Sequence, residues 1–398
     1  MKKFFIAIML FAAAIGSAAQ SRDNYTVIIS LDGIRWDYAE MFDCPFFDYI
    51  AQNGVKAIMK PSFPTKTFPN HYTLATGLVP DHHGIVSNSF YDNETGDRYA
   101  IGNKVAENGK YYGGDPIWLT AKRQGVVTAT VYWVGSDVAV KNDHATYWRH
   151  YRDPNGRLNN DERVDEMMRL LQLPENERPH FIMGYFEEPD HSGHNFGPCS
   201  KQCRKAVESI DALLKGFWQR ISALPYADKV NFIVTGDHGM TAIDHDRTIP
   251  VKKYIKDEWV KAVEGNLPGL IYVTKPEYAD SIVAAYKDVE HVRVFKSGEV
   301  PARYNYGTNP RVGDVVVIPD KGWLFTDDPV KSGGTHGFDA DMSDMHVMFR
   351  AMGPDFKVGY VKHYKFINTD IYPLLCHLLQ VEAEPCDGTL DRVIDMLK

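Results

Sequence analysis

The sequence predicts an α/β protein with a doubly wound, mainly parallel sheet and an inserted cap or subdomain. Of its 398 residues, 44% are hydrophobic and 24% are charged, which supports a large core and excludes disordered or collagen-like chains. Continuous β-rich runs alternate with helical patterns along most of the chain, as in sheets covered by helices on both faces. The alternation weakens between about residues 243 and 335, where the insertion is expected.

Five uninterrupted β-rich runs are expected to form strands. They span residues 25–31, 126–132, 180–186, 230–235 and 314–318. Such runs are typical of strands buried on both faces. The clearest helix is expected at 201–221, where apolar side chains such as Val207, Leu214 and Ile221 recur on one face at helical spacing.

Residues 1–19 have the pattern of a secretory signal peptide, because two lysines precede an apolar stretch at 4–15 and a group of small residues. An uncleaved anchor is the alternative, although this stretch is short for a membrane span. We therefore expect residues 20–398 to form one exported domain, periplasmic or secreted, without a stable membrane anchor.

Export would place the cysteines where disulfides can form. The close pairs Cys199/Cys203 and Cys376/Cys386 are plausible bridges, with Cys44 left over. The formal net charge is −8 and the chain has no basic run, so a nucleic-acid polymer is not expected as a partner. Nothing in the sequence predicts an obligate protein partner.

Acidic and histidine side chains follow three of the expected strands, and a further histidine lies in a glycine-rich segment. In chain order these residues are Asp32, Asp190, His194, Asp237, His238 and His336. Parallel strands present ligands at their carboxyl ends, so these side chains should meet at one sheet edge. Aspartate and neutral histidine suit zinc, and about six ligands suit two ions. Each residue alone could be a helix cap or part of a turn, but together they predict a metal centre.

A second candidate lies in the segment at 61–71. Pro69 and Asn70 indicate a helix start, which would put Thr67 just before the helix N-terminus, where backbone N–H groups favour an anion. A threonine hydroxyl becomes a good nucleophile only when its pKa is lowered, for example by a metal ion. From spacing alone, a plain helix cap remains the simpler interpretation of Thr67.

Six motifs then occur in a fixed order along the chain. They are LDG at 31–33, PTKTFPNH at 64–71, HGIVSN at 83–88, EPDHSGH at 188–194, DHGM at 237–240 and THG at 335–337. This set resembles the nucleotide pyrophosphatase/phosphodiesterase family of the alkaline-phosphatase superfamily, from about residue 25 to 380. The chain resembles a minimal catalytic domain of bacterial type, without the accessory domains of several animal members.

The resemblance implies two zinc ions and a threonine nucleophile. Asp190, His194 and His336 match the ligands of one ion, and Asp32, Asp237, His238 and the Thr67 hydroxyl match those of the other. Thr67 matches the nucleophile, which forms a covalent intermediate. Asn88 matches the residue that holds a phosphoryl oxygen together with the Phe68 N–H group. The other histidines of these motifs, such as His71, His83 and His191, are expected to have structural or supporting roles.

The resemblance also implies a preference for nucleotides, which would be cleaved to nucleoside 5′-monophosphates. Residues 132–163 are similar to the insertion loop of nucleotide-preferring members. Phe68 and Tyr151 match positions that sandwich a base, and Trp133 and Asp137 are expected to shape the same pocket. The alternatives are a choline-type lysophospholipid phosphodiesterase, a phosphomonoesterase, or a metal-stabilised exported binding protein without activity. The sulfatase pattern does not fit the residues around Thr67.

Overall fold

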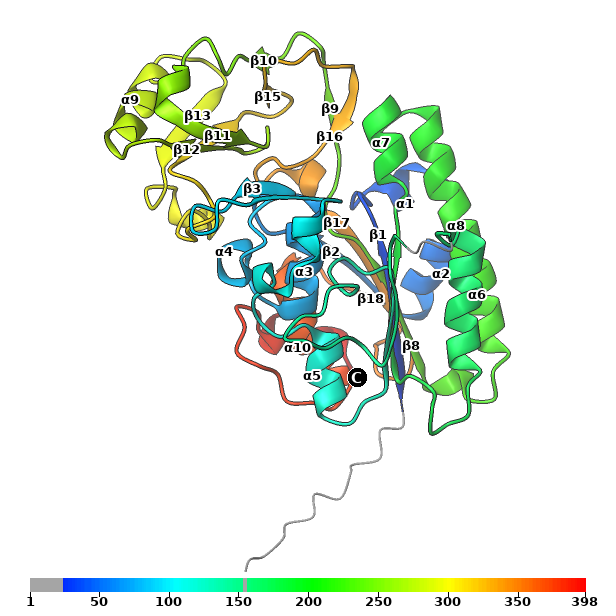
Figure 1. The fold of residues 1–398 in the computed structure, drawn as a ribbon. Coiled ribbons are helices and arrows are strands. Elements are labelled where there is room, and N and C mark those ends of the chain that lie inside the picture. The colour runs from blue at the N-terminus through cyan, green and yellow to red at the C-terminus, as the bar shows by residue number, and fades with distance from the viewer. Residues whose placement is uncertain (1–23, 153–155) are drawn as a thin grey trace, which may run out of the picture.

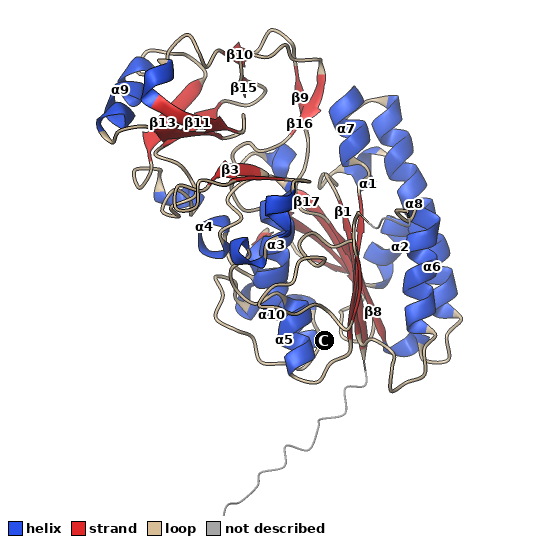
Figure 2. Ribbon diagram, viewed as in Figure 1, coloured by secondary structure: helices blue, strands red, loops and turns tan. Residues whose placement is uncertain are grey.

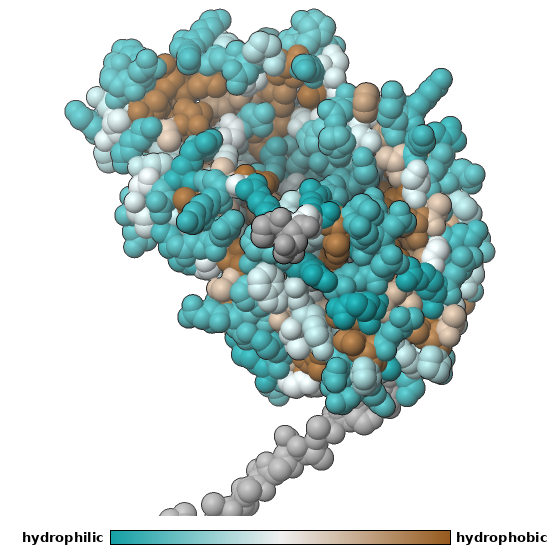
Figure 3. Space-filling view, turned by 45° about the vertical axis from the view of Figure 1, so that its right-hand side comes forward, coloured by the Kyte–Doolittle hydropathy of each residue, from teal (hydrophilic) through white to brown (hydrophobic). Residues whose placement is uncertain are grey.

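A computed structural model describes residues 24–152 and 156–398 of the chain, so the signal peptide expected at 1–19 lies outside the described residues. A nine-stranded sheet forms the centre and a smaller lobe is built around a second sheet (Figure 1). Among the described residues, none of the helices has both the length and the apolar character needed to cross a membrane. Hydrophilic side chains cover most of the face seen in Figure 3, and hydrophobic ones gather on the small lobe at the upper left.

The central sheet runs in the order β18-β2-β17-β8-β1-β7-β5-β6, and β19 pairs beside β18 on β2. Its strands are β1 (Tyr25–Leu31), β2 (Val55–Lys60), β5 (Thr128–Val131), β6 (Tyr147–Arg149), β7 (Phe181–Phe186), β8 (Val230–Thr235), β17 (Val347–Met352), β18 (Tyr360–Val361) and β19 (Phe366–Ile367). β17 pairs antiparallel with both neighbours, and all the other pairings are parallel. The predicted α/β class is therefore confirmed, with one antiparallel strand inside the sheet.

Helices cover both faces of this sheet (Figure 2). One layer contains α1 (Tyr38–Met41), α2 (Pro45–Asn53), α6 (Asn160–Leu171), α7 (Asp190–Phe196) and α8 (Lys201–Ser222). The other layer contains α3 (Thr67–Thr76), α4 (Pro80–His83), α5 (Ile117–Arg123) and α10 (Ile371–Leu378). Helix α8 follows its predicted pattern, since Val207, Leu214 and Ile221 are buried and the Ser200 side chain caps its N-terminus.

The smaller lobe has its own antiparallel sheet and its own hydrophobic core. The sheet order is β11 (Val260–Glu264), β12 (Gly269–Val273), β14 (Val315–Pro319) and β13 (Val292–Lys296), and α9 (Glu277–Ala285) packs on β13 and β14. The run expected at 314–318 is thus a strand of this lobe and not of the central sheet. Buried Asp81 of α4 ties the lobe to the centre by accepting hydrogen bonds from the backbone N–H groups of residues 307–309.

Short ribbons and turns complete the structure. The two-stranded ribbons are β3 (Ser89–Tyr91) with β4 (Arg98–Ala100), β9 (Thr241–Ile243) with β16 (Gly333–Thr335), and β10 (Thr248–Ile249) with β15 (Leu324–Phe325). Single 3-10 turns occur at Lys104–Glu107, Gly109–Tyr111, Ala227–Lys229, Asp257–Trp259, Ala302–Tyr304, Ser343–Met345, Asn368–Asp370, Leu390–Arg392 and Ile394–Met396. The ribbon β9–β16 matters for the site, because it leads directly into the segment that carries His336.

All five cysteines lie in the described part of the chain and are free thiols. The expected bridges at Cys199/Cys203 and Cys376/Cys386 are therefore not formed in this structure. At the first pair, the Cys203 thiol points into the core and donates to the Tyr38 hydroxyl oxygen at 3.5 Å, whereas Cys199 is exposed. At the second pair, Cys376 is buried in α10 and the Cys386 thiol contacts a backbone carbonyl oxygen in the following loop.

Buried His83 joins α4 to α3, the helix that carries Thr67. Its Nε2 lies 3.1 Å from the Pro69 carbonyl oxygen and 3.0 Å from the Thr73 hydroxyl, while Nδ1 accepts the Ile85 N–H at 3.1 Å. One ring nitrogen donates and the other accepts, so the ring is neutral. Burial lowers the pKa of His83 to about 3.

Protonation of His83 is therefore expected to destabilise the fold under acid conditions. Between pH 6.5 and about 3 the unfolded chain binds this proton and the folded chain does not, so stability falls as the pH falls. The contribution is up to about 1.4 kcal/mol per pH unit. Urea titrations across this range should give a shallower slope for His83→Gln than for wild type. The exposed His363→Gln is the control, and equal slopes for all three proteins would contradict the prediction.

Candidate active site

The acidic residues predicted at the strand ends meet at the carboxyl edge of the central sheet. Asp32 follows β1, Asp190 begins α7 just after β7, and Asp237 follows β8. These three strands are neighbours, because β1 pairs with β7 on one side and with β8 on the other. Gly33 has a positive φ of 70°, and a Cβ there would lie 3.0 Å from the Asp190 backbone. A glycine is therefore required for Asp32 and Asp190 to approach one another.

Two groups of ligand-type atoms form at this edge. One consists of Asp32, Asp237 and His238, and the other of Asp190, His194 and His336. Within each group the side-chain oxygen and nitrogen atoms lie within 4.8 Å of one another. Ligands of a single zinc ion, each about 2 Å from the metal, lie roughly 3–4 Å apart. These are the six residues that the sequence predicted to converge, divided as the family resemblance implies, and both groups are compact enough to hold a divalent cation.

The three histidines of these groups are oriented as metal ligands are. In each, Nδ1 lies within hydrogen-bond distance of a backbone carbonyl oxygen: His194 with Gly334 at 2.8 Å, His336 with Thr65 at 2.8 Å, and His238 with Gly239 at 2.9 Å. Donation from Nδ1 leaves the Nε2 lone pair free for a metal. Burial lowers the pKa of His194 and of His336, which favours this neutral form. The two Nε2 atoms are only 3.1 Å apart, as expected where lone pairs face bound cations.

The carboxylates give independent support for cation binding. Asp32 Oδ1, Asp190 Oδ1 and Asp237 Oδ2 are buried and accept no hydrogen bond. His238 Nε2 lies 2.9 Å from Asp237 Oδ2, but it is not oriented to donate to that oxygen. Buried, unpartnered carboxylate oxygens are costly in a protein interior, and a bound cation removes that cost. The donor set therefore fits divalent metal ions, and its oxygen and imidazole chemistry suits zinc.

The ionisation of the carboxyls reflects the same crowding. Burial raises the pKa of Asp32 well above its ordinary value, and the neighbouring carboxylates Asp237 and Asp190 raise it further. Burial also raises the pKa of Asp190. At Asp237 the nearby His238 and His71 outweigh the effect of burial, so the pKa falls well below its ordinary value. Three carboxylates this close stabilise one another's protonated forms unless positive charge lies between them.

Thr67 lies at the first residue of α3, with Lys66 as the N-cap. The helix thus begins two residues earlier than Pro69 and Asn70 had indicated, and Thr67 is inside the first turn rather than just before it. Its Oγ1 is 3.2 Å from His238 Nε2, so the hydroxyl adjoins the group formed by Asp32, Asp237 and His238. This position combines a hydroxyl, a helix N-terminus and a candidate cation site.

Asn88 and Phe68 lie together at this helix N-terminus. The Phe68 N–H donates to Asn88 Oδ1 at 3.0 Å. The two groups expected to share a phosphoryl oxygen are thus bonded to each other, and the Asn88 amide N–H₂ retains the donors. Their joint role in holding a phosphoryl oxygen stays a prediction.

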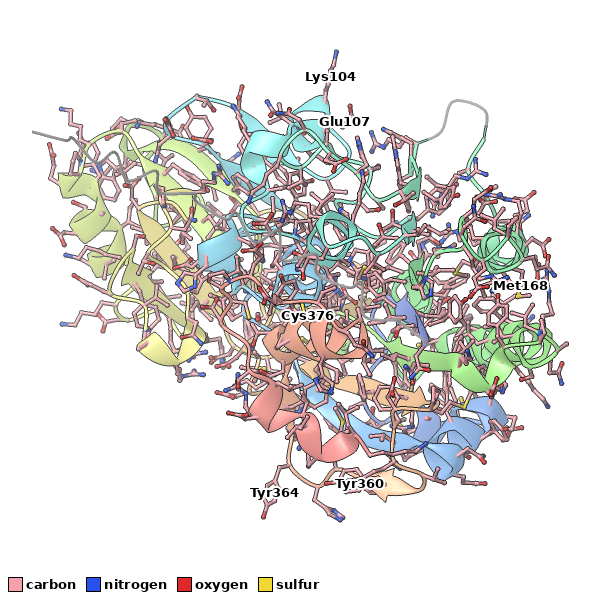
Figure 4. The ribbon with its side chains drawn as sticks, turned by 90° about the horizontal axis from the view of Figure 1, so that it is seen from below. Lys104, Glu107, Met168, Tyr360, Tyr364 and Cys376 are labelled. Carbon is pink, nitrogen blue, oxygen red and sulfur yellow. The ribbon has the colours of Figure 1, made fainter. Side chains whose placement is uncertain are left out.

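An aromatic cavity of about 250 Å³ opens beside Thr67. It brings together the base-pocket residues expected from the sequence: Phe68, Trp133, Asp137 and Tyr151. Trp133 is buried and its indole N–H donates to the His71 carbonyl oxygen at 3.1 Å, while Asp137 accepts the Tyr151 backbone N–H at 3.2 Å. The cavity extends outward to Glu107, which lies at the edge of the molecule opposite Tyr360 and Tyr364 (Figure 4).

Three further residues contribute to the site without having been predicted. Tyr185 donates its hydroxyl to Asp32 Oδ2 at 2.6 Å, and the Lys66 ammonium donates to the His336 carbonyl oxygen at 2.9 Å. Glu187 accepts hydrogen bonds from the Tyr151 hydroxyl at 2.9 Å and from buried Arg163 at 2.8 Å. Tyr185 and Glu187 could have been found, because they flank the end of the strand that leads to Asp190.

Comparisons with known proteins give a family and several relatives for this chain. The family model described as type I phosphodiesterase/nucleotide pyrophosphatase matches residues 26–339. Venom phosphodiesterase 2 of Crotalus adamanteus is 33% identical over 94% of this chain and 47% of its own length. Human ectonucleotide pyrophosphatase/phosphodiesterase family member 1 is 32% identical over 94% of this chain and 42% of its own length. The chain thus spans about half the length of these curated relatives.

Solved structures are similar over their whole length. Murine ectonucleotide pyrophosphatase/phosphodiesterase 5 has a TM-score of 0.88 and 31% identity, covering 94% of this chain and 100% of that chain. An inactive threonine-to-alanine variant of the same murine protein, in complex with AMP, has a TM-score of 0.87 and 30% identity over the same shares.

The orientation of the histidines predicts which ones hold metal. His238→Gln should lower the metal content of the protein, because it removes a free Nε2 lone pair from the ligand set. His83→Gln is the matched control, since both ring nitrogens of His83 are already engaged and it should leave the content unchanged. Both variants and wild type would be dialysed identically and assayed by inductively coupled plasma mass spectrometry. Equal metal loss in the two variants would contradict the assignment.

Proposed function

The chain belongs to the type I phosphodiesterase/nucleotide pyrophosphatase family, and from this premise we propose that it is a zinc-dependent hydrolase of nucleotide phosphodiester and pyrophosphate bonds. Its substrates are nucleoside triphosphates and dinucleotides, which it cleaves at the α-phosphorus to nucleoside 5′-monophosphates. Thr67 is the nucleophile. The reaction takes place in an exported, periplasmic or secreted protein, consistent with the signal-peptide pattern at 1–19.

The position of the Thr67 hydroxyl carries the proposal. It lies 3.2 Å from His238 Nε2, at the N-terminus of α3, and it lines the aromatic cavity. The hydroxyl that we propose as the nucleophile therefore adjoins both a candidate cation site and an aromatic cavity large enough for a base. This arrangement is what transfer of a nucleotidyl group requires, because the phosphorus must lie next to the hydroxyl while the nucleoside is held at the side.

Two zinc ions fit the donor set described above. Asp32, Asp237 and His238, together with the Thr67 hydroxyl, would hold one ion. Asp190, His194 and His336 would hold the other. When bound, the ions lower the pKa of the Thr67 hydroxyl and neutralise negative charge on the phosphoryl oxygens. Two bound ions would also attract an anionic substrate to a chain with a formal net charge of −8.

The protein side chains act in two displacements at phosphorus. In the first, Thr67 Oγ1 gives its proton to solvent and forms a bond to phosphorus, while the bond from phosphorus to the leaving oxygen breaks and that oxygen keeps the electron pair. In the second, a water oxygen forms a bond to phosphorus and gives a proton to solvent, the bond from phosphorus to Thr67 Oγ1 breaks, and Oγ1 takes up a proton from solvent to regenerate threonine. The Asn88 amide N–H₂ and the positive N-terminal end of the α3 dipole stabilise the charge that grows on the phosphoryl oxygens. His71 helps to position Thr67, because the His71 Nδ1 atom lies 2.9 Å from the Thr67 carbonyl oxygen.

The aromatic cavity favours nucleotides among the possible diesters. Phe68 and Tyr151 offer faces for stacking, which accept any base and so give weak base selectivity. The relative solved with AMP supports a nucleotide as ligand. A choline headgroup would also suit aromatic faces. A choline-type lysophospholipid therefore remains the second substrate to be tested.

Thr67→Ala should abolish turnover, by at least about 10³-fold, because it removes the attacking oxygen. Its metal content should remain at about two zinc ions per chain, as in wild type, because most of the ligands come from other residues. Thr67→Ser should retain measurable activity, since it keeps a hydroxyl at the same place. Activity of Thr67→Ala equal to that of wild type would remove the nucleophile assignment, and one zinc or none in wild type would remove the two-ion site.

A substrate panel distinguishes the alternatives. Zinc-loaded protein should hydrolyse 4-nitrophenyl thymidine monophosphate at least about tenfold faster, by kcat/KM, than 4-nitrophenyl phosphate or choline lysophospholipid, because aromatic contacts each contribute about 1–3 kcal/mol. EDTA should abolish the activity and zinc should restore it. Faster monoester or lysolipid turnover would select the corresponding alternative, and no turnover of any substrate would favour a binding protein.

A further inference from the structure

A second cavity, of about 530 Å³, borders the reaction centre. Its wall includes His194 and His336, whereas the aromatic cavity borders Asp32 and Thr67. The two cavities therefore adjoin different ligand groups, with the Thr67 hydroxyl on the side of the aromatic one. The larger cavity is not needed to hold a nucleoside, and the mechanism above leaves it without a role.

The chemistry of this second cavity contrasts with that of the first. Among its described lining residues, the only rings with π faces are the two ligand histidines. Polar and cationic side chains dominate instead: Lys66, Asn88, Asn266, Thr326 and Lys331. Its one carboxylate is Asp328, so lysines outnumber acids on the wall. A hydrophilic wall with excess positive charge suits a polyanion, and it lacks the tyrosine, tryptophan and phenylalanine faces of the aromatic cavity.

The lining residues come from two parts of the chain. Lys66 and Asn88 belong to the nucleophile region, and the Lys66 ammonium is held against the His336 carbonyl oxygen at 2.9 Å. Asn266, Thr326 and Lys331 belong to the segment inserted between β8 and β17. Lys331 is exposed and forms no ion pair among residues 24–152 and 156–398, so its charge is available to a ligand. The wall of the second cavity is therefore formed jointly by the nucleophile region and by the segment inserted between β8 and β17.

The direction of the displacement connects this cavity to the reaction. A leaving group departs in line with the attacking oxygen, from the far side of phosphorus. Thr67 Oγ1 lies beside His238, in the first ligand group. His336 stacks on His238 with ring centroids 3.5 Å apart, so the second ligand group lies next to the first. Because His194 and His336 border the second cavity, we take this cavity as the one that receives the leaving group.

We propose that this cavity binds the diphosphate leaving group of a nucleoside triphosphate, with Lys331 and Asn266 as its anion-binding residues. The inference rests on the function proposed above and adds a subsite to it. The bond between the α-phosphorus and the bridging oxygen breaks, that oxygen keeps the electron pair, and the diphosphate leaves as pyrophosphate. The inserted segment thereby selects the leaving group, while the aromatic cavity selects the nucleoside.

The test compares substrates that differ in their leaving group. Lys331→Ala should raise the KM for ATP about tenfold, because a charge-assisted contact to a phosphate is lost. The KM for 4-nitrophenyl thymidine monophosphate, whose leaving group carries no phosphate, should change less than about twofold. Lys331→Glu should raise the KM for ATP further, since a carboxylate at this position repels the phosphates that the lysine attracts. Asn266→Ala should show the same selectivity with a smaller effect, and Lys261→Ala, on an exposed position of β11 outside both cavities, is the control.

Binding measurements make the outcome independent of turnover. Calorimetry on zinc-loaded protein would compare α,β-methylene-ATP, which carries the diphosphate, with AMP, which does not. Lys331→Ala should weaken the binding of α,β-methylene-ATP and leave the binding of AMP unchanged. Equal changes for both ligands, or no change for either, would overturn the subsite. If wild type bound α,β-methylene-ATP with the expected selectivity but hydrolysed neither substrate, the proposed function would fail while the subsite stood.

Discussion

The convergence of three buried carboxylates at the ends of adjacent parallel strands is the constraint on which the rest of the site depends. Asp32, Asp190 and Asp237 are brought together by the pairing of β1 with β7 and β8. Each leaves one oxygen without a hydrogen bond. Such an arrangement is unfavourable on its own, because like charges repel in a medium that screens poorly. Bound divalent cations would offset this repulsion. The histidines around the three carboxylates are placed to complete the binding sites for such cations.

The backbone around these carboxylates orients the three imidazoles of the candidate metal centre. Carbonyl oxygens at Thr65, Gly239 and Gly334 face the Nδ1 atoms of the three ligand histidines. All three carbonyls lie within two residues of a candidate site residue, namely Thr67, His238 or His336, so positioning one group positions the next. Thr65 is two residues from Thr67, and its contact with the His336 ring links α3 to the segment of His336.

Much of this arrangement was predictable from the sequence. Uninterrupted apolar runs identified β1, β5, β7 and β8, and the acidic residues after three of them identified the site edge. β2 and β17 escaped detection because charged residues interrupt both runs: Lys56 lies within VKAIMK, and VMFRAM contains Arg350, which is buried. The helix start at Thr67 was misplaced because Pro69 is favourable within any first helical turn and does not mark its first residue. Hydrogen bonds such as Tyr185 to Asp32 depend on strand register, which residue patterns do not give.

Strand β7 shows how the aromatic cavity and the metal centre are held by one element. Its Tyr185 donates to Asp32 at 2.6 Å, and Glu187, just beyond its end, accepts from the Tyr151 hydroxyl at 2.9 Å. Buried Arg163 of α6 fixes this stretch by donating to the Tyr185 carbonyl oxygen and to Glu187, both at 2.8 Å. Because the same short segment orients the Asp32 carboxylate and a wall of the aromatic cavity, the central sheet sets the distance between that cavity and the candidate metal centre. A loop could not fix that distance equally well, since its backbone lacks the paired strands on either side.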